Sequence, residues 1–219
     1  MIDCGCTASH HRKRIVLTGG PGAGKTAVLE LVRQHLCRHV DVLPESASIL
    51  FHGGFRRGAT LLARAATQRA IFAVQRELEN VADAESEPAI VLCDRGTVDG
   101  LAYWPGPADF FEQLGISREA ELARYDAVIH LRTPPAGDGY TLSTNPARIE
   151  TAAEAAAIDE RIALAWAGHP RRYVVESSAN FVHKAERAIA LLRREMPECC
   201  RRRVAPVSRS RAKEAVALP

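Results

Sequence analysis

The sequence predicts a doubly wound α/β fold built on a mostly parallel sheet of five strands. Short, almost continuous apolar runs alternate along the chain with longer segments whose apolar residues recur at helical spacing. Strands that are buried on both faces have such runs, and strands separated by helices form parallel sheets. The 219 residues, of which 47% are hydrophobic, fit one domain with a sizeable core and a short tail.

Five segments have the character of buried strands. The first ends in glycines, the second is ended by Pro44, and the third is the most apolar and runs directly into Asp94. In chain order, the expected strands are residues 14–18, 40–43, 88–93, 125–131 and 172–175.

Three segments carry the apolar stripe of an amphipathic helix, namely residues 25–38, 60–84 and 181–194. These elements predict a domain over residues 14–195, preceded by an extension, 1–13, and followed by a basic and disordered tail, 196–219. Within the domain, we expect a mobile helical lid over residues 133–167, because a Pro- and Gly-rich break there precedes a charged helical pattern.

The segment from Gly19 to Thr26 matches the phosphate-loop pattern G-x-x-x-x-G-K-[ST] between an expected strand and an expected helix. In such a loop the backbone N–H groups converge on a phosphate, the lysine reaches the β- and γ-oxygens, and the hydroxyl binds Mg²⁺. We therefore expect ATP, or alternatively GTP, together with Mg²⁺. The expected nucleotide contacts are Gly19, Gly20, Pro21, Gly22, Ala23, Gly24, Lys25, Thr26 and Ala27.

Three charged residues follow neighbouring strands and are expected beside this loop. Asp94 ends the third strand, where a carboxylate would support the metal, although it could instead cap a helix. Arg95 could meet an anionic group of the acceptor or the transferred phosphoryl, or lie on the surface. Glu45 could accept a proton from an attacking hydroxyl, or serve as an outer Mg²⁺ partner or as a helix N-terminal charge.

Two further segments supply candidate residues. Arg148 and Arg161 on the lid could neutralise the γ-phosphoryl, or belong to an exposed helix with Glu–Arg pairs. The loop after the fifth strand places Ser178 and Ala179 near the nucleotide base. The chain lacks the Asn/Thr-Lys-x-Asp signature of guanine recognition, which argues against a Ras-like GTPase.

The six cysteines do not form the framework of a small secreted domain, because the chain is long. Cys37 and Cys93 fall inside apolar patterns and read as small core residues. The remaining cysteines lie near the two chain ends, without the C-x₂₋₄-C spacing of a zinc site. Two interpretations remain for Cys4, Cys6, Cys199 and Cys200. They could form a metal or redox clip between the chain ends, or be exposed thiols on frayed ends.

The net charge of +3 is unevenly distributed, because the segment from Arg193 onward carries eight basic and three acidic residues. This tail could contact anionic lipid or a protein, or be a solvated end; the sequence carries no specific nucleic-acid signal. No apolar run reaches membrane-spanning length and no signal peptide is visible, so we expect a cytoplasmic protein.

With these residues in place, the chain resembles the AAA_28 group of P-loop proteins, which contains the ribosylnicotinamide kinase domain of NAD regulators and proteins similar to the TRPL translocation defect protein. The similarity extends over residues 14–194 and includes the phosphate loop, Glu45, the Asp94-Arg95 step and the Ile158-Asp159-x-Arg161 pattern. The resemblance implies a nucleoside or nucleotide kinase-like fold with a lid, ATP–Mg²⁺ binding and phosphoryl transfer.

Three functions remain open from the sequence. The leading hypothesis is a kinase that transfers the γ-phosphoryl of ATP to a small, nucleoside-like acceptor. In this hypothesis Lys25 and Thr26 position ATP–Mg²⁺, Asp94 supports the metal, Glu45 is the base, and the lid arginines neutralise charge. The alternative is a nucleotide-dependent switch or binding module whose basic tail docks on lipid or a partner. An ATPase that acts on a macromolecule is the third.

Overall fold

The computed structural model describes residues 4–85, 88–135, 150–178 and 180–201. Its centre is a five-stranded sheet in the order β2-β3-β1-β4-β5, and every pairing of neighbouring strands is parallel. The expected fold class is therefore confirmed. The strands are β1 (Lys13–Thr18), β2 (Val40–Leu43), β3 (Ile90–Asp94), β4 (Ala127–Leu131) and β5 (Arg172–Val175).

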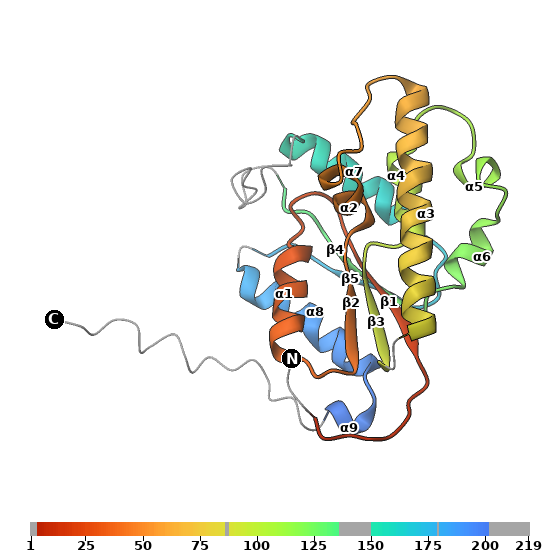
Figure 1. Ribbon diagram of the computed structural model, residues 1–219. Helices are drawn as coiled ribbons and strands as arrows, with labels where there is room; N and C mark the ends of the chain where they lie inside the picture. Colours follow the sequence, from red (N-terminus) through yellow and green to blue (C-terminus); the bar gives the residue numbers. More distant parts are fainter. Residues whose placement is uncertain (1–3, 86–87, 136–149, 179, 202–219) are drawn as a thin grey trace.

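Helices cover both faces of the sheet (Figure 1). The three helices expected from the apolar stripes are α1 (Lys25–His35), α3 (Leu61–Glu85) and α8 (Phe181–Glu195), and the lid region contains α7 (Ala152–Ala165). The short elements were not predicted from the sequence, because three to seven residues carry too little of a helical period. They are α2 (Ser46–His52), the 3₁₀ turn η1 (Thr97–Asp99), α4 (Gly100–Tyr103), α5 (Phe110–Gln113), α6 (Arg118–Leu122) and α9 (Glu198–Arg201).

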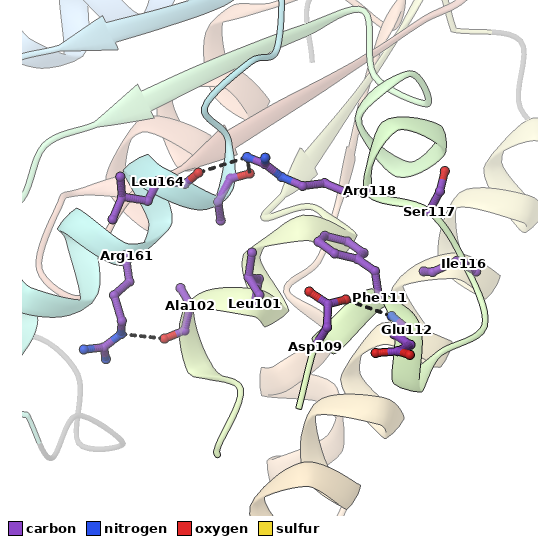
Figure 2. A pocket seen from close by; sticks show the side chains of 11 residues that line it. Leu101, Ala102, Asp109, Phe111, Glu112, Ile116, Ser117, Arg118, Arg161 and Leu164 are labelled. Atoms are coloured by element: carbon purple, nitrogen blue, oxygen red, sulfur yellow. Dashed lines mark hydrogen bonds between the residues drawn. The ribbon is translucent and has the colours of Figure 1, made fainter. Parts of the chain in front are cut away.

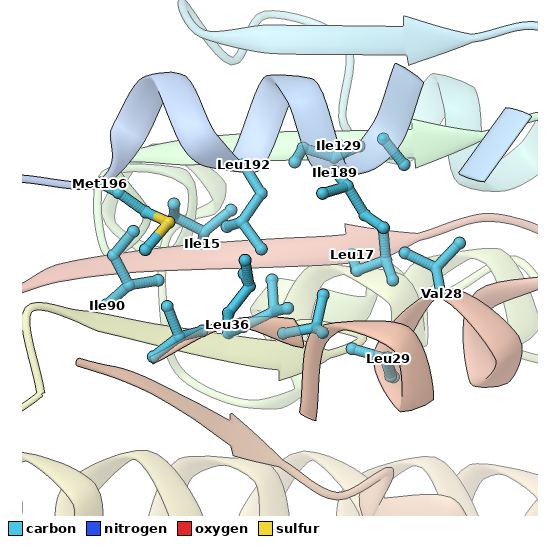
Figure 3. Close-up of a cluster of buried hydrophobic side chains, with 14 of the residues drawn as sticks. Ile15, Leu17, Val28, Leu29, Leu36, Ile90, Ile129, Ile189, Leu192 and Met196 are labelled. Carbon is cyan, nitrogen blue, oxygen red and sulfur yellow. The ribbon is translucent and has the colours of Figure 1, made fainter. Parts of the chain in front are cut away.

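The core has one layer on each face of the sheet, because successive side chains of a strand point to opposite faces. Ile15 and Leu17 of β1 point to the layer beneath α1 and α8, as Figure 3 shows. Val16 points to the other layer, where it packs with Trp166 and the buried residues of α7. Burial on both faces explains why the central strands read as unbroken apolar runs.

Helix α7 begins at a capping box, in which Thr151 and Glu154 satisfy each other's backbone N–H groups. Residues 136–149, in which part of the expected lid falls, lie outside the described residues.

Packed structure continues past residue 195, since Met196 and Cys200 are buried in the layer under α8. At the other end, Cys4 is buried in the same layer. The expectation of exposed thiols on frayed ends is therefore wrong for Cys4 and Cys200. Most of the basic tail, residues 202–219, lies outside the described residues, and with it the basis for a lipid or partner contact. Over the ranges that the structure describes, no helix is long and apolar enough to cross a membrane.

Candidate active site

The phosphate loop connects β1 to α1 at the carboxyl edge of the sheet, on the central strand. Its glycines are required by conformation and by space. Gly19 has φ +141°, and a Cβ there would lie 2.1 Å from the carbonyl oxygen of Leu131. Gly24 has φ +91° and abuts the Phe181 ring, which a Cβ would meet at 2.5 Å. At both positions the neighbouring residues leave no room for a side chain, so only glycine fits. The backbone of the loop is therefore not covered by side chains of its own at these positions and can face a ligand.

Lys25 begins α1 and is buried. Its Nζ donates to the carbonyl oxygens of Gly19 at 2.8 Å and Gly20 at 3.1 Å, so the ammonium lies against its own loop. Burial, followed by the nearby Arg95 charge, lowers the pKa of Lys25 to about 8. The side chain is thus a desolvated cation held at the centre of the loop, in the place where an anion would gain most from it.

Asp94 and Thr26 form a pair of oxygen donors beside that cation. Asp94 ends β3, in register with Leu17 of β1, and burial raises its pKa to about 6. One oxygen of Asp94, Oδ1, is buried with no hydrogen-bond partner among the described residues. Thr26 lies exposed at the start of α1 and lines the same cavity. A buried carboxylate oxygen without a partner and a threonine hydroxyl in the same cavity are the kind of hard oxygen donors that Mg²⁺ prefers.

Arg95 and Glu45 form an ion pair at the mouth of the loop. Arg95 Nε donates to Glu45 Oε1 at 2.7 Å, and a terminal nitrogen of the same guanidinium donates to the Gly19 carbonyl at 3.2 Å. Ser48 donates to the second Glu45 oxygen at 2.5 Å. Although burial acts to raise it, the pKa of Glu45 falls to about 2 because of Arg95, Ser48 and Lys25. Glu45 is therefore a fixed anion, and it also occupies the position before α2.

Asp99 fastens this edge of the sheet and was not assigned a role from the sequence. Its carboxylate accepts from the Thr18 hydroxyl at 2.7 Å and from the Trp166 indole at 2.6 Å. Arg95 lies 3.6 Å from its other oxygen. The residue that precedes the phosphate loop is thus tied to the end of α7 through one buried carboxylate. In the sequence, the position of Asp99 five residues after Asp94 is the only indication that it lies near the site.

Asp159 is the second functional position that sequence reasoning missed. Its Oδ1 accepts from the Gly20 N–H and contacts His130 Nε2, both at 2.8 Å. Its Oδ2 accepts from the Thr133 N–H at 3.2 Å and pairs with Arg132 at 3.1 Å. A residue of α7 therefore contacts the phosphate loop directly. In the sequence, Asp159 stands out only as a member of the Ile158-Asp159-x-Arg161 pattern and was given no role there.

Arg161 is not brought to the phosphate loop. Two residues along a helix correspond to a rotation of about 200°, so Asp159 and Arg161 point in opposite directions. Arg161 donates to the Ala102 carbonyl at 2.8 Å and lines a second cavity, of about 700 Å³, between α4, α5 and α7 (Figure 2). The second cation there, Arg118, donates to carbonyls at the end of α7. Both cations of that cavity hold backbone groups together.

The remaining sequence candidates divide into two groups. Arg148 and Ala179 lie outside the described residues. Ser178 accepts from the Asn180 N–H at 3.3 Å, just before α8, and Ala27 is exposed on α1. Neither of these two lines the cavity at the phosphate loop.

That cavity has a volume of about 680 Å³ and lies between the phosphate loop, α2, α3 and residues 94–103. It brings together five of the charged or hydroxyl residues expected from the sequence, namely Lys25, Thr26, Glu45, Asp94 and Arg95. The walls contributed by α2, α3 and the loop between them were not predicted from the sequence. They include the aromatic residues Phe51 and Phe72, the amide Gln68, and the cations Arg57 and Arg64.

The arrangement can hold an anion on Lys25 and the loop backbone, a hard cation on Thr26 and Asp94, and a hydroxyl against Glu45. All three places belong to one cavity, whose far wall carries the aromatic side chains of Phe51 and Phe72.

Comparison with known proteins agrees with this geometry. The family model AAA_28, described as an AAA domain, matches residues 14–184. Two similar solved structures are thymidylate kinases. The enzyme of Candida albicans has a TM-score of 0.53 at 12% identity, over 86% of this chain and 95% of its own. The enzyme of Ehrlichia chaffeensis has a TM-score of 0.50 at 15% identity, over 83% and 99%. No curated protein matches the chain.

Proposed function

From the premise that this chain belongs to the AAA_28 family, we propose that it is a kinase that transfers the γ-phosphoryl of ATP to a nucleoside-like acceptor. The observation that carries the proposal is the shared cavity. Lys25 and Thr26 of the phosphate loop, Asp94 and the Glu45–Arg95 pair line the same 680 Å³ space, which continues between α2 and α3.

The residues present fit a nucleotide phosphate with Mg²⁺. The left-handed glycines leave the loop backbone open, Lys25 is desolvated, and Asp94 Oδ1 is buried without a partner among the described residues. Lys25 would exchange the Gly19 and Gly20 carbonyls for phosphate oxygens, and Thr26 and Asp94 would hold the metal and its waters. When bound, Mg²⁺–ATP supplies a phosphoryl group whose charge the metal has partly neutralised.

Glu45 is proposed to receive the hydroxyl of the acceptor. Phosphoryl transfer has a loose transition state and depends mainly on positioning, so a strong base is not needed. With a pKa of about 2, Glu45 is ionised at neutral pH and can accept a hydrogen bond from that hydroxyl and later its proton. Arg95 fixes the carboxylate and places a second cation next to Gly19 of the loop.

The acceptor is proposed to lie between α2 and α3. Phe51 and Phe72 offer apolar surface for a planar ring, and Gln68 offers an amide for its edge. Arg57 and Arg64 line the same wall and would suit an acceptor that carries a phosphate. The thymidylate kinases with a similar fold act, by their name, on a nucleoside monophosphate. Both nucleosides and nucleoside monophosphates therefore belong in the test.

The test measures ADP and GDP release with pooled acceptors, including nucleosides, their monophosphates, nicotinamide riboside, sugars and amino-alcohols. We expect acceptor-dependent release above the rate in water. Lys25→Ala should weaken nucleotide binding by roughly 10- to 100-fold, because a charge-assisted contact is lost. Glu45→Gln and Asp94→Asn should retain nucleotide binding and lower turnover by roughly 100-fold or more.

A matched control is Glu30→Gln, which makes the same chemical change on the exposed side of α1. This variant should keep both nucleotide binding and turnover. Unchanged turnover in the Lys25, Glu45 and Asp94 variants would rule the kinase mechanism out. Tight nucleotide binding with release no faster than in water would instead favour a nucleotide-dependent switch.

A further inference from the structure

Three segments that are distant in the sequence bring cysteine and histidine side chains together at one edge of the sheet. Cys4 comes from the N-terminal segment, Cys37 and His39 from the connection between α1 and β2, and Cys200 from α9. Strand β2 begins one residue after His39, so the cluster lies at the amino edge of the sheet. The phosphate loop lies at the opposite, carboxyl edge, and the two sites are separate.

The four ligand atoms of this group lie within 4.8 Å of one another. Nδ1 of His39 lies 3.0 Å from the Cys4 sulfur, 3.2 Å from that of Cys200 and 3.7 Å from that of Cys37. The sulfurs of Cys4 and Cys200 are 3.9 Å apart. One ring nitrogen therefore faces three thiols around a common centre.

These distances agree with tetrahedral metal geometry. Zinc–sulfur bonds of about 2.3 Å and a zinc–nitrogen bond of about 2.0 Å place two sulfurs about 3.8 Å apart, and sulfur and nitrogen about 3.5 Å apart. The observed separations lie within a few tenths of an ångström of both values. A small shift of each side chain would place the four atoms around one ion.

The group is closed to solvent. The exposed fractions are 0% for Cys37 and Cys200, 2% for Cys4 and 7% for His39. Three cysteines and one histidine form one of the usual ligand sets of structural zinc sites, which have no open coordination position. Soft thiolate donors exclude Mg²⁺ and Ca²⁺, which take oxygen ligands.

We propose that Cys4, Cys37, His39 and Cys200 bind one zinc ion in a closed, structural site. The ion would join the N-terminal segment, the connection before β2 and α9 by coordination bonds. Because the ligands come from both ends of the chain and from its interior, the site would close very long loops of the unfolded chain, and zinc would stabilise the fold strongly.

A second, smaller group lies beside the first. Cys6, His10 and Cys199 place their ligand atoms 3.3–3.4 Å apart, and all three residues are partly exposed. Cys199 is the neighbour of Cys200 in α9, and the ring of His10 meets that of His39 edge to face. With three protein ligands and access to solvent, this group would hold a metal less firmly than the closed site.

A disulfide between Cys4 and Cys200 is the competing explanation of the juxtaposed sulfurs. Among the described residues, which include all six cysteines, no disulfide is formed. The competing reading accounts for two of the three sulfurs around His39, and it gives no role to the imidazole nitrogen that all three face. Metal binding uses all four groups.

The experiment uses the full chain, purified under reducing conditions and dialysed against a mild chelator that removes loosely held metal. We expect one zinc ion per chain by elemental mass spectrometry. Cobalt added to stripped protein should give the visible bands of a tetrahedral site and thiolate-to-cobalt charge transfer. His39→Gln and Cys37→Ser should lose the retained zinc. Cys93→Ala changes a buried cysteine of β3 outside the cluster and should retain it.

The cobalt titration of the unmodified chain keeps the proposal testable if a ligand variant fails to fold. Folded, reduced protein that retains no zinc and gives no thiolate-to-cobalt bands would overturn it, as would an intact Cys4–Cys200 disulfide in freshly isolated protein. One zinc ion that persists in the Cys6→Ser variant but not in His39→Gln would assign it to the closed site.

Discussion

Arg95 combines an unusual backbone with an unusual set of contacts. Its φ of +71° makes it the non-glycine residue with left-handed backbone among those described, a conformation that costs roughly 1 kcal/mol. The side chain spans Glu45, Asp99 and the Gly19 carbonyl, and its guanidinium lies 5.6 Å from the centre of the Tyr103 ring. Strain that is retained at such a position points to a role in function.

We predict that Arg95→Lys lowers turnover by roughly 100-fold, because an ammonium cannot donate to Glu45 and Gly19 in two fixed directions. Nucleotide affinity should change much less, since Lys25 remains. If Arg95 acts through Glu45, adding Glu45→Gln should cost far less than the two single effects combined. Steady-state kinetics of the two single variants and the double variant measure this coupling, and strictly additive losses would contradict it.

The residues of the candidate site that directly follow the ends of strands were largely predictable from the sequence. Lys25, Glu45, Asp94 and Arg95 share a cavity because the carboxyl ends of parallel strands meet at one edge, which follows from the sequence pattern. Asp99 and Asp159 were not predictable in the same way. Their partners depend on how α7 packs on the sheet, and the sequence does not reveal that angle.

Helix α7 is joined to the phosphate loop through one carboxylate, that of Asp159. Asp159 faces the loop, whereas the next residue, Glu160, is 64% exposed and pairs with Arg132 at the surface. Arg161, two residues after Asp159, points away from the loop and donates to the Ala102 carbonyl, so its contact with a phosphoryl group stays a prediction. Sequence spacing shows which residues share a face of a helix. Which groups those residues contact depends on how that face packs against the rest of the protein.

We predict that Asp159→Ala destabilises the protein by roughly 3–5 kcal/mol, since it leaves buried His130 and the Gly20 N–H without their acceptor. Nucleotide affinity should fall as well, because Gly20 belongs to the phosphate loop. Urea unfolding and nucleotide titration measure the two effects. Glu160→Gln is the matched control on the exposed side of α7 and should stay within about 0.5 kcal/mol of the unmodified protein. Equal effects of the two substitutions would remove Asp159 from this role.

At the scale of the whole molecule, the two candidate sites lie at opposite edges of an apolar sheet. The carboxyl edge holds the desolvated charges of the candidate active site, and the amino edge holds the thiols and His39. Sequence patterns predicted the sheet and its three long helices to within a few residues. They could not predict that the chain ends meet, because such contacts depend on the path of residues 4–12 and 196–201 after the sheet has formed.

The pH dependence of global stability offers a test of how α8 is attached to this framework. Lys184 of α8 is buried and donates to the Arg132 carbonyl at 2.5 Å, and burial lowers its pKa from 10.5 to about 8. Between these pH values the unfolded chain keeps a proton that the folded chain has lost. The contribution of Lys184 to the free energy of unfolding therefore rises with pH, by at most about 3 kcal/mol.

We expect Lys184→Met to remove this dependence, because methionine fills similar space and does not titrate. Urea unfolding at several pH values from 7.5 to 10.5 would measure the free energy of unfolding of both proteins. The value for the unmodified protein minus that for the variant should be lowest near neutral pH, where the ammonium is buried and charged, and should increase as the pH passes 8. Parallel stability curves would show that Lys184 reaches water in the folded protein, and its charge would then play no part in anchoring α8.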